Sequence, residues 1–242
     1  MEQIAKPFEK FFPGNHLILG EAGSGKTRLI WWLLQEKEYA EDNSINIVLT
    51  DSEKRIWSRP KNYPIFVLDP YDTDISWATN PHKPGIYYCA CDYAPRLVTF
   101  LECLATWAMN QENVAGKTVR LFVDLSSKYW ALPEFVEQLI RLHYIMDGRN
   151  EMDGSIEIWS VFGSLKKIPL KAKPLFQKSS LVLLNPIPQD WTENIGGFLD
   201  LKEEKAALIT QIDEQQTKGY YYLPVQDDTL FLNPDPIKQI DY

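Results

Sequence analysis

The sequence has few of the residues that hold structural metals or close disulfides. Its 242 residues include three cysteines, Cys89, Cys91 and Cys103, and three histidines. It has no CxxC pair and no Cys/His cluster with zinc spacing. Because three cysteines cannot all pair with one another, a disulfide-stabilised secreted domain is also disfavoured. We therefore expect a reducing, intracellular compartment: the cytoplasm, or the host cytoplasm if the protein is viral.

Long hydrophobic runs and an excess of positive charge are absent as well. No stretch reaches the roughly 18 consecutive apolar residues of a membrane-spanning helix, and the first fifteen residues do not read as a signal peptide. The formal net charge of -8 argues against a polybasic membrane anchor and a wholly basic nucleic-acid coat. The negative net charge does not exclude DNA binding through a local basic patch, because the electrostatic field near the patch, and not the net charge, determines such a contact. We expect no membrane partner.

What the chain does have is material for a large core in an α/β domain. Hydrophobic residues make up 45%, with 8 Trp, 12 Tyr and 11 Phe. Short apolar runs predict strands at 16–19, 45–50, 65–68, 86–91, 119–123, 156–162 and 181–184. Longer amphipathic or breaker-free stretches predict helices at 27–38, 95–109, 133–146 and 203–216. This alternation predicts a mainly parallel sheet with helices on both faces.

The ends of the chain differ from this pattern. Residues 1–15 predict an irregular lead-in, and two short strands within 219–232 predict a small C-terminal β-hairpin. We expect one domain covering 1–242, because a chain of this length has little room for two full α/β domains.

A phosphate-binding motif lies between the first predicted strand and the first predicted helix. The pattern G-x-x-x-x-G-K-[ST] is met at every fixed position, which predicts a P-loop (Walker A) NTPase. The strand before it and the helix after it argue against a chance match. The residues expected to bind nucleotide are Gly20, Glu21, Ala22, Gly23, Ser24, Gly25, Lys26, Thr27 and Arg28.

Each part of the motif has a chemical reason. Glycines let successive backbone N–H groups approach phosphate oxygens without a Cβ clash, and the helix N-terminus favours an anion. Lys26 supplies a cation for the β- and γ-phosphates, and Thr27 offers a hydroxyl to Mg²⁺. The expected ligands are therefore ATP and Mg²⁺.

A second metal ligand is expected at the end of a neighbouring strand. Asp124, after the apolar run 119–123, is the first choice, and Asp69 and Asp51 are the rivals. Many hydrolytic P-loop proteins have a glutamate directly after this aspartate, but here Leu125 follows. Three explanations stay open: another residue activates the water, turnover is slow, or the protein binds ATP without hydrolysing it. Ser126 is a weak alternative, because a neutral hydroxyl is a poor base.

The order of these features resembles the FtsK/HerA superfamily of ATPases, and within it the small branch of viral genome-packaging ATPases and Zot-like phage morphogenesis proteins. The resemblance covers about residues 15–232 and rests on one specific motif, the P-loop, with the rest carried by the order and spacing of elements. It implies a ring of subunits with ATP between neighbours, and an arginine donated in trans. Candidate arginines are Arg141, Arg149 and Arg96. Ser160 or Ser164 would stand where the family's sensor strand usually ends in Gln.

The leading functional hypothesis is a ring-forming motor ATPase that uses Mg-ATP to translocate or package double-stranded DNA. Five lysines between 166 and 178 form the densest basic stretch, which either contacts a phosphate backbone or is a solvated loop. The alternative is an ATP-binding assembly or scaffold factor with weak or no hydrolysis. A small-molecule kinase is a third hypothesis, but such kinases usually carry an arginine-rich lid over the phosphates, and this sequence has no such arginine cluster.

Overall fold

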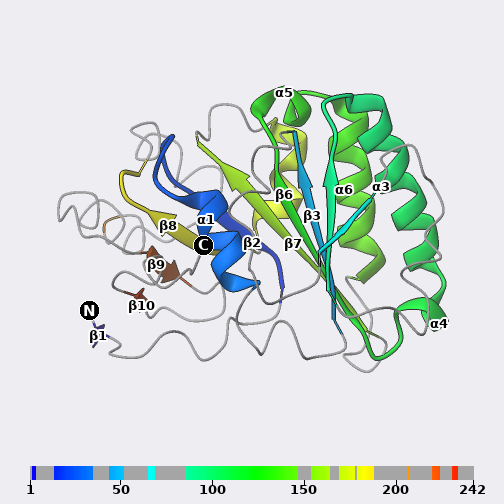
Figure 1. The fold of residues 1–242 in the computed structure, drawn as a ribbon, viewed down its shortest axis with the longest axis horizontal. Helices are drawn as coiled ribbons and strands as arrows, with labels where there is room; N and C mark the ends of the chain where they lie inside the picture. Colours follow the sequence, from blue (N-terminus) through cyan, green and yellow to red (C-terminus); the bar gives the residue numbers. More distant parts are fainter. Residues whose placement is uncertain are drawn as a thin grey trace.

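The backbone of the described residues forms a single sheet. A computed structural model describes residues 2–3, 14–34, 44–51, 65–68, 85–146, 154–163, 169–177, 179–187, 207, 220–223 and 231–233. Ten strands occur in the order β1-β10-β9-β8-β2-β7-β6-β3-β5-β4 (Figure 1). Their bounds are β1 Glu2–Gln3, β2 His16–Leu19, β3 Ser44–Thr50, β4 Ile65–Val67, β5 Ile86–Ala90, β6 Thr118–Asp124, β7 Ser155–Phe162, β8 Ser180–Leu184, β9 Tyr220–Leu223 and β10 Phe231–Asn233.

The seven strands from β8 to β4 all run parallel. At the β8 edge, β9 pairs antiparallel with β8, and β10 pairs antiparallel with β9. The predicted parallel sheet and the antiparallel C-terminal strand pair are confirmed. The central strands are continuous apolar runs because a parallel sheet is buried on both faces.

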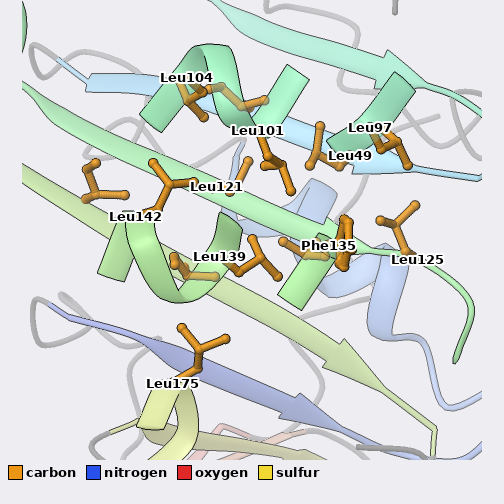
Figure 2. Packing of buried hydrophobic residues seen from close by; sticks show 14 of the residues in the cluster. Leu49, Leu97, Leu101, Leu104, Leu121, Leu125, Phe135, Leu139, Leu142 and Leu175 are labelled. Carbon is orange, nitrogen blue, oxygen red and sulfur yellow. The ribbon is translucent and has the colours of Figure 1, made fainter. Parts of the chain in front are cut away.

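Helices cover both faces of the sheet, as predicted (Figure 1). On one face, α1 (Lys26–Leu33) packs in a cluster with Ile18, Phe122 and Trp159. On the other, α3 (Ala94–Met109) and α6 (Pro133–Met146) pack together over β3 and β6. Figure 2 shows leucines of this second cluster, with Leu49 and Leu121 of the sheet between side chains of α3 and α6.

The sequence of α6 explains why it forms and how it is oriented. Pro133 opens the helix, where its missing N–H costs nothing. Phe135, Leu139 and Leu142 recur at helical spacing and are all fully buried. Each such side chain contributes about 1.5–3 kcal/mol by leaving water. Because only the short segment 125–132 separates β6 from α6, the start of α6 lies near the carboxyl end of β6, where the predicted site is.

Four short helices were not predicted: α4 (Gln111–Val114), α5 (Ser127–Trp130), the 3₁₀ helix η5 (Leu170–Ala172) and α7 (Lys173–Gln177). They have at most five residues, too few for a periodic apolar pattern to emerge. The strand β1 falls in the predicted irregular lead-in and pairs parallel with β10, which satisfies part of an otherwise open strand edge.

Two predicted helices lie partly or largely outside the residues that the structure describes. The first helix is described to Leu33 and the predicted continuation to about residue 38 lies beyond it. Of the predicted helix 203–216, only Ala207 is described, and it is helical. Among the described segments, no helix has the length and apolar character needed to cross a bilayer.

Candidate functional site

The P-loop turns between β2 and α1 at the carboxyl edge of the sheet. Gly23 and Gly25 have φ angles of 84° and 95°, in the left-handed region that favours glycine. A Cβ on Gly20 would collide with the Ser24 side chain and lie 2.9 Å from the Leu184 carbonyl. The glycines of the motif are therefore required by the path of the backbone itself.

Neighbouring strands fix the start of the loop. The Gly20 N–H donates to the Phe162 carbonyl at the end of β7 (3.3 Å), and the Glu21 N–H donates to the Pro186 carbonyl beyond β8 (2.9 Å). Lys26 Nζ folds over the loop and donates to the carbonyls of Gly20 and Glu21, each at 2.6 Å. The ammonium group is thus held above the cradle that the motif forms.

Asp124 meets the P-loop across the sheet. The Thr27 hydroxyl donates to Asp124 Oδ2 at 2.6 Å, although 97 positions separate the two residues. Asp124 is the last residue of β6 and only 6% exposed. It reaches Thr27 although β7 lies between β6 and the P-loop strand β2. Of the two rivals, Asp51 contacts Ser126 instead (3.1 Å from Oδ2 to the backbone nitrogen), and Asp69 lies outside the described residues.

A pocket of about 670 Å³ opens over this pair. Its walls come from three places: the P-loop and α1, the end of β6 with the turn after it, and the end of β7. The lining residues are Ala22, Gly23, Gly25, Lys26, Thr27, Arg28, Asp124, Leu125, Ser126, Ser127, Val161, Phe162 and Gly163. The volume lies in the range of small-molecule sites.

The groups around the pocket fit a nucleotide phosphate with a magnesium ion. The Thr27 hydroxyl and the Asp124 carboxylate are hard oxygen donors, which suit Mg²⁺, and that ion completes its shell with phosphate oxygens and waters. Ser126 Oγ is buried at the wall and has no hydrogen-bond partner among the described residues. An orphaned hydroxyl here is suited to contact a polar ligand.

A buried phenol, that of Tyr129, lies near Asp51. Burial, and then the nearby Asp51, Cys91 and Asp92, raise the pKa of Tyr129 to about 12. The Tyr129 hydroxyl donates to the Cys91 carbonyl at 3.1 Å. It therefore stays protonated at neutral pH and adds no charge to this edge.

Other predicted residues lie elsewhere. Ser160 is buried inside β7, two residues before the strand ends, and does not line the pocket. Arg141 lies in the second half of α6, where a guanidinium nitrogen is 3.1 Å from Met109 Sδ. Arg96 lies in the first turn of α3, at the carboxyl edge of the sheet. Arg149 and Ser164 are outside the described residues.

Several wall residues carry no signal in the sequence. Leu125, Val161 and Phe162 are apolar and indistinguishable from core, and Ser127 looks like an ordinary turn residue. Only the pairing of strands could have identified them, because β7 lies beside β2 in parallel register and brings Phe162 level with Leu19.

Several solved structures share this architecture. No family model and no curated protein matches the sequence. Among solved structures, the genome packaging NTPase B204 from Sulfolobus turreted icosahedral virus 2, in complex with ATP-gammaS, is similar with a TM-score of 0.58 and 12% identity, over 93% of this chain and 99% of that one. VirB4 of Thermoanaerobacter pseudethanolicus is similar with a TM-score of 0.56 and 10% identity, over 91% and 88%.

The DNA-packaging ATPase B204 from Sulfolobus turreted icosahedral virus gives a TM-score of 0.56 and 13% identity, over 92% of this chain and 98% of that one. Identities this low establish the fold alone. The chain has the α/β fold of these solved structures, which agrees with the fold class that its sequence predicts.

Proposed function

We propose that this protein is a single-domain ATPase that binds Mg-ATP at the P-loop and couples its hydrolysis to movement of double-stranded DNA. One observation carries the Mg-ATP part of the proposal: the Thr27 hydroxyl lies 2.6 Å from Asp124 Oδ2 on the wall of the pocket above the P-loop. A hydroxyl and a carboxylate in this relation are the protein's share of a magnesium site in P-loop ATPases.

The roles of the residues follow from their positions. The backbone N–H groups of the loop and the α1 N-terminus would hold the phosphates, and Lys26 would move from the loop carbonyls to the β- and γ-phosphates. Thr27 and Asp124 would hold Mg²⁺, which neutralises charge on the phosphates when bound. Arg28 lines the same pocket and would add a second cation there.

DNA movement is proposed from the fold and from local charge. B204 is described as a genome packaging NTPase and a DNA-packaging ATPase, and it has been solved with ATP-gammaS and with AMPPCP. In this chain Lys171 is exposed, Lys173 is half-buried and Leu170 is 82% exposed between the carboxyl end of β7 and β8. Lysines here suit a phosphate backbone. Lys166, Lys167 and Lys178 of the same stretch lie outside the described residues.

A ring of identical subunits would complete the site. Of the two candidate arginines that the structure describes, Arg96 is better placed to reach a neighbour's γ-phosphate, because it lies at the same edge of the sheet as the P-loop. Arg141 lies further from this edge, beside Met109. Arg149 stays a candidate from the sequence.

One observation favours the alternative, an assembly factor that binds ATP without turnover. Leu125 occupies the position after Asp124 and is 5% exposed within the core cluster that contains Phe135 (Figure 2). A carboxylate that activates water is therefore excluded from this position.

The test is ATP turnover with and without double-stranded DNA, for the wild-type protein and the Lys26→Ala variant. We expect DNA-stimulated turnover in the wild type, and loss of ATP binding and turnover in Lys26→Ala, because the phosphates lose their main cation. Lys128→Ala is the matched control: it removes an exposed lysine from α5, close to the site but outside the pocket wall.

The outcomes separate the two functions. Tight ATP binding without turnover, with or without DNA, would favour the assembly factor. Equal turnover in Lys26→Ala and wild type would remove the ATPase proposal altogether.

A further inference from the structure

The site lacks a carboxylate where P-loop hydrolases often have one, directly after Asp124. Strand alternation puts Asp124 on the α1 face of the sheet and Leu125 on the opposite face, where it packs with the α3 and α6 cluster (Figure 2). A neighbouring strand that ends on the Leu125 side is one place from which a water-activating carboxylate could come.

Asp51 fulfils this condition by register. β3 lies next to β6, and Thr50 pairs with Asp124 at the ends of the two strands. Continuing both strands by one residue sets Asp51 beside Leu125. Alternation agrees, because Ile47 and Leu49 of β3 belong to the same cluster as Leu125.

A direct contact ties Asp51 to the pocket wall. Its Oδ2 accepts a hydrogen bond from the Ser126 backbone nitrogen at 3.1 Å, and Ser126 lines the pocket. Asp51 is half-buried, whereas Asp92, near the end of the next strand β5, is exposed. The carboxylate is thus one hydrogen bond away from a residue of the pocket wall, and it does not contact Thr27 or occupy the expected metal position.

We propose that Asp51 replaces the missing glutamate and orients the water that attacks the γ-phosphate. This inference rests on the proposed ATPase function. The water oxygen bonds to the γ-phosphorus as the bond to the β,γ-bridging oxygen breaks, and ADP leaves with that electron pair. The proton released by the water passes to Asp51 and then to solvent. The Ser126 hydroxyl, buried at the same wall, is a second hydrogen-bonding group for this water.

Asp51→Asn is the decisive variant because it separates charge from structure. The asparagine carbonyl can still accept from the Ser126 nitrogen, so the turn after β6 keeps its anchor. A general base contributes about 10²–10⁴-fold to a rate, so we expect at least about a 100-fold fall in kcat. Affinity for ATP-gammaS and thermal stability should stay at the wild-type level, and Asp51→Glu should keep more turnover than Asp51→Asn.

Asp92→Asn is the matched control, since it neutralises an exposed aspartate at the same edge one strand away, and its turnover should equal wild type. Wild-type turnover in Asp51→Asn would overturn the role of Asp51 and leave the ATPase proposal standing. A parallel loss of nucleotide affinity or stability would make Asp51 an anchor only and overturn the role too. A wild-type protein without turnover would overturn both proposals.

Discussion

Strand β6 carries a charged side chain at each end of the face that α1 covers, and the two ends differ in what they contact. Near the amino end, Arg120 Nε lies 3.2 Å from Glu157 Oε2 of β7. At the carboxyl end, Asp124 accepts a hydrogen bond from Thr27. Phe122 lies between them in the α1 cluster.

Burial alone does not distinguish the two carboxylates, because Asp124 and Glu157 are each 6% exposed. Their partners and positions do. Glu157 contacts a guanidinium inside the sheet, which neutralises both charges. Asp124 contacts a hydroxyl and lines a pocket at the carboxyl edge, where ligands of open α/β sheets bind. The direction of the strand therefore separates a carboxylate that pairs inside the sheet from one that lies at the pocket, where we propose that it binds a ligand.

The largest expected effect comes from breaking the amino-end pair. Glu157→Leu leaves the Arg120 guanidinium buried without its carboxylate, which should lower the free energy of unfolding by about 3–5 kcal/mol. Denaturant unfolding measures this change. ATP affinity of the folded fraction should not change, because neither residue lines the pocket.

The double variant Arg120→Met/Glu157→Leu is the matched control. It replaces both charges by apolar groups of similar volume, so most of the lost stability should return. A single variant as stable as wild type would show that this pair is not what neutralises Arg120.

A smaller effect, of a different kind, is expected at the carboxyl end. Asp124→Asn keeps an oxygen that can accept from Thr27, so the free energy of unfolding should change little. Turnover should fall about 100-fold, or about 2.7 kcal/mol, because the amide is a poor Mg²⁺ ligand. The Mg²⁺ dependence of nucleotide binding should weaken as well.

Glu134→Gln serves as its control, since Glu134 is an exposed carboxylate in the first turn of α6. A destabilised Asp124→Asn protein with normal Mg²⁺ dependence would place Asp124 with the structural carboxylates and erase the contrast between the two ends.

The comparison of the two ends of β6 also shows which of these residues can be predicted from the sequence and which cannot. The P-loop and Asp124 were accessible because both sit where an apolar run ends, and parallel strands end at one edge of a sheet. The partner of Arg120 was not accessible. It lies 37 positions away, and only the register between β6 and β7 sets the two side chains opposite each other.

Two other expected site residues, Ser160 and Asp51, also depend on how the strands are placed in the sheet. Ser160 is a candidate only through the family resemblance, which puts a sensor residue at the end of this strand, and in the structure Ser160 lies two residues before the end of β7. The sequence suggests Asp51 only as a rival metal ligand. Its contact with Ser126 depends on β3 being the neighbour of β6, which chain order does not reveal because β4 and β5 intervene in the sequence.

The smallest expected effect tests whether the amino end tolerates another charge. The imidazole of His16 is stacked on the ring of Trp159, with 3.7 Å between the ring centroids. Burial, together with the nearby charge of Arg120, lowers the pKa of His16 to about 3. Between that value and the ordinary 6.5, the unfolded chain binds a proton that the folded chain does not. Stability from this group is thus complete above the unfolded pKa and lost as the pH falls toward 3.

His16→Phe keeps an aromatic ring against Trp159 but cannot take up the proton. Wild type should lose about 2 kcal/mol more than His16→Phe between about pH 7 and about pH 5, measured by denaturant unfolding at each pH. His143→Gln, which removes a half-buried histidine of α6 and leaves His16 in place, should follow wild type. Parallel curves for wild type and His16→Phe would mean that the amino end accommodates a second cation, and that its neutrality is not what sets it apart from the Asp124 end.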